Sequence, residues 1–129
     1  MRNPKQFIEF QAVDMDQGWE TPPGYPDGIA QKILAGALDE ESKIGNRTRL
    51  LHFGAGVFTV EPFVHDYWEE VFLISGDLTV GNDASGQGGE SFGPHTYACR
   101  PPGKFHGPFT SKGGCLLLEV HYYVDDDGD

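Results

Sequence analysis

The sequence predicts an all-β protein with a single domain, and three observations support this fold class. The chain has 129 residues, which suits one domain that buries roughly two-thirds of its unfolded surface. It contains 18 glycines and 9 prolines, and these residues separate short apolar runs. The runs have the length and spacing of strands joined by turns, so we expect a β-sandwich or barrel.

The first 28 residues are expected to form a strand and an arm that pack on the barrel. Residues 6–11 alternate weakly between apolar and polar side chains and predict an edge strand. Residues 14–28 contain too many prolines and glycines for regular structure. We expect them to form an ordered loop over the domain.

The predicted barrel spans residues 29–124, and residues 125–129 form an acidic tail that we expect to be disordered. Periodicity alone allows either a helix or a strand over 29–38, and we favour a strand. The charged residues 39–43 predict a hairpin turn. Further strands are expected over 47–53, in two strands of 62–80 that meet near Gly76, over 97–100 and 105–109, and over 115–124, the clearest strand of all.

The charge balance excludes one large class of partners. The chain has 20 acidic and 9 basic side chains, which gives a formal net charge of −11. A phosphate backbone would be repelled, so nucleic acid is not an expected partner.

No stretch approaches the ~20 apolar residues of a membrane span, and the first residues lack the apolar core of a signal peptide. We therefore expect a cytoplasmic protein with no membrane partner.

Two cysteines, Cys99 and Cys115, are expected to be free and mostly buried thiols. Neither has a second cysteine at the spacing of a structural zinc site. Any bound metal must therefore use nitrogen and oxygen ligands.

Residues 61–76 contain the most informative pattern in the chain. His65 and Glu69 stand four residues apart before an apolar run, which Gly76 closes with a turn. Side chains alternate between the two faces of a strand, so Glu69 faces the barrel interior if His65 does. A closed barrel would bring the strand with His106 close to this segment. Two nitrogens and one carboxylate then converge.

The spacing of these residues resembles the cupin family, and the resemblance covers residues 45–122. Residues 45–56 look like the strand and turn that enter the first cupin motif, especially in cupins similar to the anti-sigma-factor sensor domain and to dihydroxyacetophenone-type dioxygenases. The resemblance implies a double-stranded β-helix, the jelly-roll barrel of cupins. The two matching patterns are His65-x3-Glu69-x6-Gly76 and Pro101-x-Gly103-x2-His106.

The resemblance implies that His65, Glu69 and His106 bind a divalent first-row metal. Two histidines and one carboxylate with open positions favour Fe(II), and Zn, Mn or Ni remain open. Phe63 stands where the family places its first histidine, so three protein ligands are expected instead of four. The alternative is that these three side chains form a hydrogen-bonded cluster in a barrel that has lost its metal, with Phe63 filling the vacancy.

Several neighbours of the predicted ligands are candidates for other roles. Tyr67 and Glu70 are the candidates for a general base. Glu70 is expected on the opposite strand face, at the surface or near Arg100. The predicted substrate pocket consists of Phe63, Tyr67, Val71 and Leu73.

Three further histidines lack motif spacing. We expect His95 to be exposed at a turn and His121 to lie at the surface or in an interface. His52 is the alternative replacement for the missing ligand. The strand over 115–124 has apolar residues at both parities, so we expect a homodimer with Leu117 facing the interface.

The resemblance favours a metal-dependent dioxygenase that acts on a small hydroxyketone or diketone. A small-molecule or metal sensor without catalytic activity is the second alternative, and a cupin isomerase or lyase is the third. The fold does not select among these three classes. In each of them a small molecule is the expected substrate or ligand.

Overall fold

The protein is described here by a computed structural model in which residues 3–124 are placed. This part of the chain forms nine strands and no helix, which confirms the predicted all-β class. No helix in residues 3–124 is therefore long and apolar enough to cross a membrane. The strands are β1 (Ile29–Asp39), β2 (Ile44–Phe53), β3 (Val57–Phe58), β4 (Trp68–Gly76), β5 (Leu78–Val80), β6 (Glu90–Phe92), β7 (Tyr97–Arg100), β8 (Phe109–Ser111) and β9 (Cys115–Tyr122).

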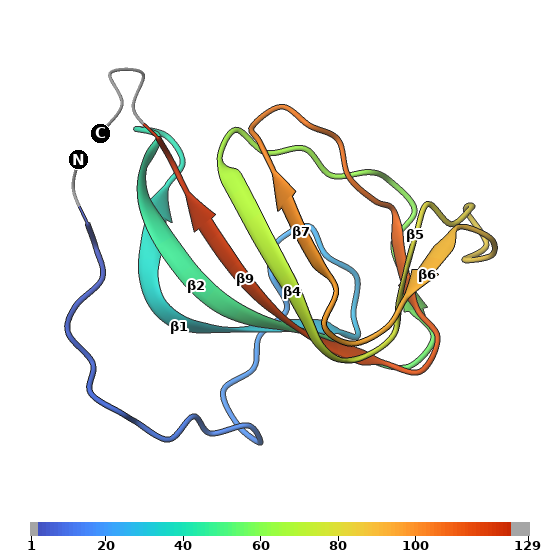
Figure 1. Cartoon of the computed structure of the whole chain (residues 1–129), viewed down its shortest axis with the longest axis horizontal. Helices are drawn as coiled ribbons and strands as arrows, with labels where there is room; N and C mark the ends of the chain where they lie inside the picture. The colour runs from blue at the N-terminus through green and yellow to red at the C-terminus, as the bar shows by residue number, and fades with distance from the viewer. Residues whose placement is uncertain (1–2, 125–129) are drawn as a thin grey trace.

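Two antiparallel sheets make up the fold (Figure 1). The larger sheet has the strand order β1-β2-β9-β4-β7, and the smaller has the order β3-β8-β5-β6. Strands β2 and β4 both pair with β9, so the middle of the large sheet combines segments far apart in the sequence. This arrangement is consistent with a jelly-roll barrel.

The predicted strand over 6–11 does not form. Phe7 and Phe10 are 88% and 103% exposed, and this segment pairs with no other strand in the structure. A strand needs a backbone partner for its N–H and C=O groups, and the weak alternation of 6–11 carries no information about one. The arm instead contacts the barrel near β1, where Glu20 and Gln31 form an isolated antiparallel bridge.

The apolar core joins the two sheets at one end of the barrel. Its buried members come from β1, β2, β4, β5 and β9, and Leu78 supplies the contribution of the small sheet. The core cluster consists of Ile29, Leu51, Phe53, Val71, Leu73, Leu78, Cys115 and Leu117. The prediction of buried thiols is confirmed for Cys115 and wrong for Cys99, which is exposed.

Strand β9 alternates strictly, and its faces are the reverse of what the sequence predicted. Leu117 is 3% exposed and His121 is fully buried, whereas Leu118 and Val120 are only half-buried. The predictions that Leu117 faces an interface and that His121 lies at the surface are therefore wrong. The polar side chains of β9 face inward because partners from other strands satisfy them there.

Gly76, which ends β4, lies in tight contact with the start of β9. Its φ is +88°, and a Cβ atom at this position would lie 2.1 Å from the carbonyl oxygen of Gly114. Gly81 has the same φ of +88°, yet a Cβ atom there would meet nothing within 4 Å. A comparison of these two positions therefore separates the cost of a positive φ from the cost of a steric clash.

We expect Gly76→Ala to destabilise the fold far more than Gly81→Ala. Both substitutions place a side chain in the left-handed region, which costs about 1–2 kcal/mol. Only Gly76→Ala adds a clash with the backbone, which costs about 1–3 kcal/mol more. Urea unfolding of the two variants beside the wild type measures this difference. Equal destabilisation would show that the approach of Gly76 to Gly114 is looser than in the structure.

Candidate metal centre

The structure brings the three predicted ligands together. His65 lies in the loop before β4, Glu69 lies in β4, and His106 lies in the loop before β8. Their candidate ligand atoms all lie within 4.8 Å of one another. Two backbone hydrogen bonds hold the loops in register, from Phe63 N to His106 O (2.7 Å) and from His106 N to Phe63 O (2.9 Å).

Glu69 is the centre of this cluster. Its side chain is buried, and a buried carboxylate is costly unless donors surround it. Oε1 accepts a hydrogen bond from Arg100 Nη1 at 3.0 Å, and Oε2 lies 2.9 Å from His121 Nε2. His106 Nε2 lies 3.3 Å from Oε1. The carboxylate therefore joins β4 to β7, to β9 and to the loop before β8.

His121 presents an N–H group to this carboxylate. Arg47 Nε donates a hydrogen bond to His121 Nδ1 at 2.9 Å, and an arginine nitrogen is always a donor. Nδ1 must therefore accept, which places the imidazole proton on Nε2. His121 thus donates to Glu69 Oε2 and holds the carboxylate in position.

His106 has the opposite arrangement. Its Nδ1 lies 3.2 Å from the carbonyl oxygen of Lys104, an acceptor, so the proton of a neutral imidazole sits on Nδ1. Nε2 then directs a lone pair toward Glu69 Oε1. A cation between the two atoms would stabilise this arrangement, and a backbone carbonyl behind the distal nitrogen is the usual support of a metal-binding histidine.

His65 adds a buried ring nitrogen to this cluster. Its Nε2 is buried and has no hydrogen-bond partner among the described residues. Burial lowers the pKa of His65 to about 4. Burial also lowers the pKa of His106. Both imidazoles are therefore neutral near pH 7, the form in which histidine binds a metal.

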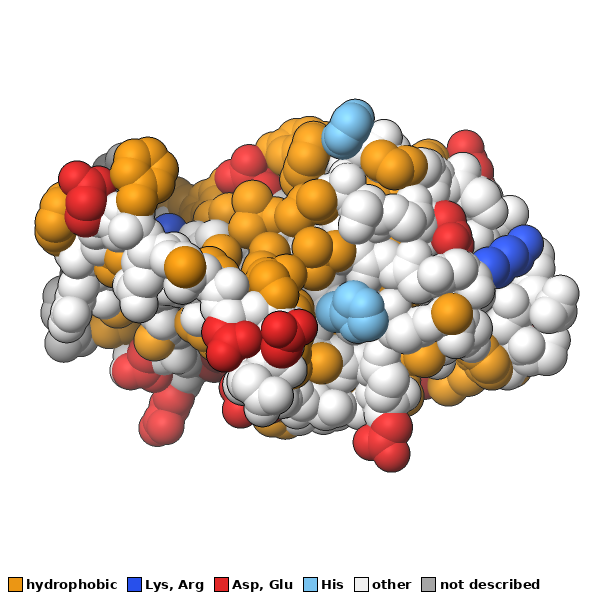
Figure 2. All heavy atoms as spheres, turned by 90° about the horizontal axis from the view of Figure 1, so that it is seen from below, with side chains coloured by type: hydrophobic (Ala, Val, Ile, Leu, Met, Phe, Trp, Pro, Cys, Tyr) orange, Lys and Arg blue, Asp and Glu red, His pale blue; other side chains and the backbone are white. Residues whose placement is uncertain are grey.

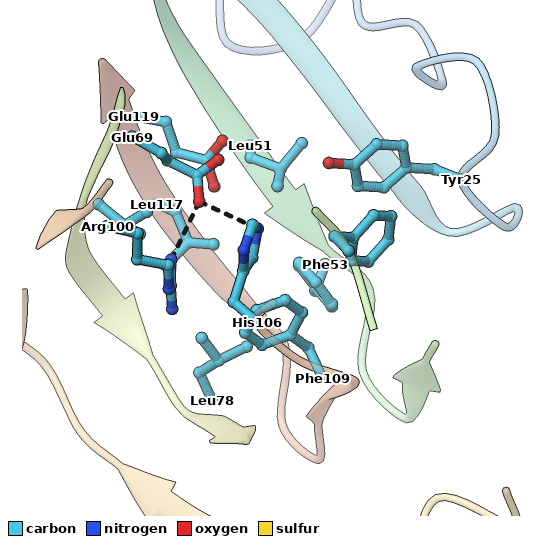
Figure 3. Close-up of a pocket in the computed structure, with 12 residues that line it drawn as sticks. Tyr25, Leu51, Phe53, Glu69, Leu78, Arg100, His106, Phe109, Leu117 and Glu119 are labelled. Atoms are coloured by element: carbon cyan, nitrogen blue, oxygen red, sulfur yellow. Dashed lines mark hydrogen bonds and ion pairs between the residues drawn. The ribbon is translucent and has the colours of Figure 1, made fainter. Parts of the chain in front are cut away.

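A small cavity adjoins this cluster (Figure 3). Its volume is about 30 Å³, which suits one water molecule or one ion. In Figure 3, Glu69, Arg100 and His106 point toward one another at this cavity, and Tyr25 and Phe109 lie on its apolar side. The donor set of two imidazoles and one carboxylate fits a divalent first-row metal.

A second group of candidate ligands, Glu69, Glu119 and His121, also lies within 4.8 Å. Hydrogen bonds already satisfy this group. Arg49 lies 2.7 Å from Glu119 Oε1, and His121 carries its proton on the nitrogen that faces the carboxylates. Although burial opposes ionisation, Arg49 holds the pKa of Glu119 below its usual value. The buried Nε2 of His65, which has no partner among the described residues, favours the first group as the ion-binding one.

Searches for similar proteins identify the fold. No family model matches the chain, and no curated protein matches it in sequence. Solved structures do match. An acetylacetone dioxygenase from Acinetobacter johnsonii is 21% identical with a TM-score of 0.64, over 97% of this chain and 84% of that one. An RmlC-like cupin from Shewanella frigidimarina is 13% identical with a TM-score of 0.63, over 96% and 97% of the two chains.

The chain has a cupin fold. The cupin-type neighbours differ in what they do. They include the polyketide cyclase RemF from Streptomyces resistomycificus, at 17% identity, a TM-score of 0.63 and coverage of 89% and 80%. They also include the complex of SigE with the anti-sigma factor ChrR from Rhodobacter sphaeroides, at 23% identity and a TM-score of 0.57, over 82% of this chain and 50% of that one. Likeness at these identities establishes the fold of the chain and leaves its reaction open.

The predicted pocket residues divide between two cavities. Phe63 and Val71 line the cavity of about 30 Å³, and Val71 and Leu73 line a neighbouring cavity of about 290 Å³. Tyr67 lines neither of these cavities. It is buried behind the site, where its ring stacks on His65 with centroids 4.6 Å apart.

Phe63 lies where the cupin motif predicts it, beside both histidines of the site. Its ring centroid is 6.4 Å from that of His65 and 6.2 Å from that of His106. The ring also stacks on Tyr25 at 5.0 Å. An aromatic ring therefore lies beside the cluster, in agreement with the expectation of three protein ligands instead of four.

Glu70 lies on the outer face of β4, as its parity predicts. Its carboxylate accepts hydrogen bonds from the hydroxyl groups of Tyr97 and Tyr122. These bonds hold the pKa of Glu70 below its usual value. The expected contact with Arg100 is wrong, because Arg100 bonds Glu69 instead. This position gives no support to Glu70 as a base inside the barrel.

Sequence reasoning missed the inward roles of Arg49, Arg100, Glu119 and His121. Alternation along 115–124 does contain a relevant pattern, because Glu119 and His121 share one parity with Leu117. The error was to take the more apolar parity as the inward one.

His52 is exposed, so it is not the replacement ligand, and His95 is exposed as predicted.

Proposed function

We propose that this cupin is a metal-dependent enzyme in which His65, Glu69 and His106 hold a divalent first-row ion. The observation that supports this most directly is that Nε2 of His65, buried and without a partner, and Nε2 of His106 both lie beside one buried carboxylate. Without a cation these groups leave a buried nitrogen unpaired, which costs about 1–3 kcal/mol. This observation also weighs against the alternative of a barrel that has lost its metal.

Fe(II) is the ion we favour, because two histidines and one carboxylate with open positions are typical of non-haem iron sites. Zn, Mn and Ni use the same nitrogen and oxygen ligands. A bound ion of this kind supplies Lewis acidity toward chelating oxygens and, if it is iron, a redox centre for dioxygen.

Alanine at His65 or His106 should abolish tight metal binding, since each removes one of three ligands. His95→Ala is the matched control, because His95 is exposed and lies outside the cluster. Protein purified without a metal-affinity tag is measured by elemental analysis before and after exposure to a chelator. Equal metal content in the wild type and the His65→Ala, His106→Ala double variant would overturn the ligand assignment.

Within this class we propose a dioxygenase that acts on a small hydroxyketone or 1,3-diketone. Such substrates offer two oxygens at chelating distance, and a set of three protein ligands leaves room for both. Phe63, Val71 and Phe109 surround the site with apolar atoms that exclude water. The similarity to acetylacetone dioxygenases supports this proposal at the level of fold.

Two other activities remain as alternatives for the same site. A sensor would bind its ligand without turnover, and the likeness to the ChrR complex favours keeping this option. An isomerase, cyclase or lyase would use the ion only as a Lewis acid, and the likeness to RemF favours this one. The three classes differ in whether dioxygen and substrate are consumed.

The Fe(II)-loaded protein should consume dioxygen when supplied with an aromatic hydroxyketone or a 1,3-diketone. An oxygen electrode measures the rate on anaerobically reconstituted protein, with Glu69→Gln and the Mn, Ni and Zn forms alongside. Glu69→Gln should lose most of the activity because it removes the charged ligand. Ligand-induced thermal stabilisation without oxygen uptake would favour the sensor, and substrate loss without oxygen uptake would favour the isomerase or lyase.

We also propose that the cupin forms a homodimer through the outer face of the large sheet. Leu116, Leu118 and Val120 of β9 are half-buried there, and Phe72 of β4 is 38% exposed. Figure 2 shows hydrophobic side chains gathered over the middle of one face of the molecule. The arm adds the exposed aromatic side chains of residues 7 and 10. Exposed apolar surface of this kind is typical of an interface.

Light scattering at micromolar concentration should give the mass of a dimer. Phe72→Asp should shift the protein toward the monomer, because it places a charge in the apolar patch. Phe105→Asp is the control, since Phe105 is 64% exposed in the loop before His106. A monomeric wild type, or a dimer insensitive to Phe72→Asp, would contradict this interface.

A further inference from the structure

We infer that Arg100 binds an anionic group of the substrate, and that the substrate is a short-chain oxo acid with an apolar tail. This inference rests on the metal site of the proposed function and assigns that site an anionic oxo acid in place of the neutral hydroxyketone or 1,3-diketone. Arg100 ends β7 and lines both the cavity of about 30 Å³ beside the metal ligands and the larger cavity of about 290 Å³. Among residues 3–124, it is the only arginine or lysine that lines either cavity.

The guanidinium of Arg100 has unused donors. Nη1 donates to Glu69, and neither Nε nor Nη2 has a hydrogen-bond acceptor among the described residues. Its side chain is 18% exposed. A guanidinium carries five N–H donors in a fixed fork that matches a carboxylate. Several of these donors are therefore free for a ligand.

Arg49 provides the comparison within the same barrel. Its Nε donates to Glu119, its Nη1 to Gln31 and its Nη2 to Tyr25, and its side chain is 3% exposed. Arg49 is therefore saturated by the protein and serves to hold the fold together. Arg100 lines two adjoining cavities and uses one nitrogen in a hydrogen bond to the protein. Its other nitrogens can therefore donate to a ligand.

The local charge also favours an anion. Arg100 neutralises Glu69, and Arg49 neutralises Glu119. With both of these carboxylates paired, a divalent ion on this site would add positive charge that no other carboxylate lining the smaller cavity offsets. Glu90 is the acidic residue that lines the larger cavity. Its side chain is exposed, so solvent screens its charge. An acidic ligand would complete the charge balance.

The larger cavity adds the requirement for an apolar tail. It shares Val71, Leu78, Arg100 and Leu117 with the smaller one, so the two cavities adjoin at these side chains. Apart from Arg100, Glu90, Thr96 and Tyr97, its lining is apolar, and its volume of about 290 Å³ suits a small ligand. Its apolar lining consists of Val71, Leu73, Leu78, Val80, Phe92, Ala98 and Leu117.

A 2-oxo acid has the features that this arrangement selects. Its carboxylate and adjacent carbonyl can chelate an ion, the carboxylate also pairs with a guanidinium, and a short alkyl chain fits the apolar cavity. A neutral diketone with the same chain can chelate but cannot form the charge-assisted hydrogen bonds. A comparison of the binding affinities of the two compounds therefore separates recognition by Arg100 from chelation by the metal.

The test compares 2-oxohexanoate with 2,3-heptanedione, in which a methyl ketone replaces the carboxylate and the butyl chain is the same. Isothermal titration calorimetry on the Zn(II)-loaded protein measures binding without turnover. We expect 2-oxohexanoate to bind about tenfold more tightly than the diketone. Arg100→Met should remove this preference, and Arg100→Lys should retain part of it. Lys112→Met is the control, because it removes one exposed positive charge away from the site.

The preference and its loss in Arg100→Met, with zinc content unchanged, support the inference. A preference that persists in Arg100→Met overturns it and leaves the metal site intact. If the wild type binds no metal, the proposed function fails, and hexanoate is then titrated against 2-hexanone on the metal-free protein. Binding of hexanoate that depends on Arg100 would still support the anion site, and equal binding in Arg100→Met would overturn it.

Discussion

The buried carboxylate of Glu69 is the interaction on which the rest of the site depends. It lies in the interior of a barrel, where an unpaired charge would cost several kcal/mol. Arg100 and His121 donate to it from the two strands that flank β4, and His106 approaches it from a loop. One side chain of β4 therefore links the two strands that flank it, β7 and β9. Loss of this carboxylate would leave Arg100 unpaired inside the protein.

Two of the histidines around that carboxylate differ in which ring nitrogen carries the proton. The hydrogen-bond partner of Nδ1 determines this in each of them. Arg47 makes Nδ1 of His121 an acceptor, so His121 offers a proton. A carbonyl oxygen makes Nδ1 of His106 a donor, so His106 offers a lone pair. The same residue type thus positions the carboxylate in one place and can bind a metal in another. Distances alone do not distinguish these roles, because both groups of candidate ligands are equally compact.

Much of the fold and part of the site could be predicted from local sequence patterns. Turn residues and alternation placed most of the strands, and motif spacing brought forward His65, Glu69 and His106. The orientation of β9 could not be predicted in the same way. Its outward parity is the more apolar one, and hydrophobicity alone therefore points to the wrong face. Its inward polar residues are stable only because Arg47, Arg49 and Glu69 meet them there.

The sequence by itself determined the all-β class, most of the longer strands and the three side chains that we propose to bind a cation. These features depend on local alternation, turn chemistry and short spacings, which a chain carries without its tertiary contacts. Only the tertiary structure decided that Arg100 faces the cavity with free donors, that Arg49 is saturated, and which histidine nitrogens hold protons. These properties depend on partners as distant in sequence as Arg47 and His121, which become neighbours only when β2 pairs with β9.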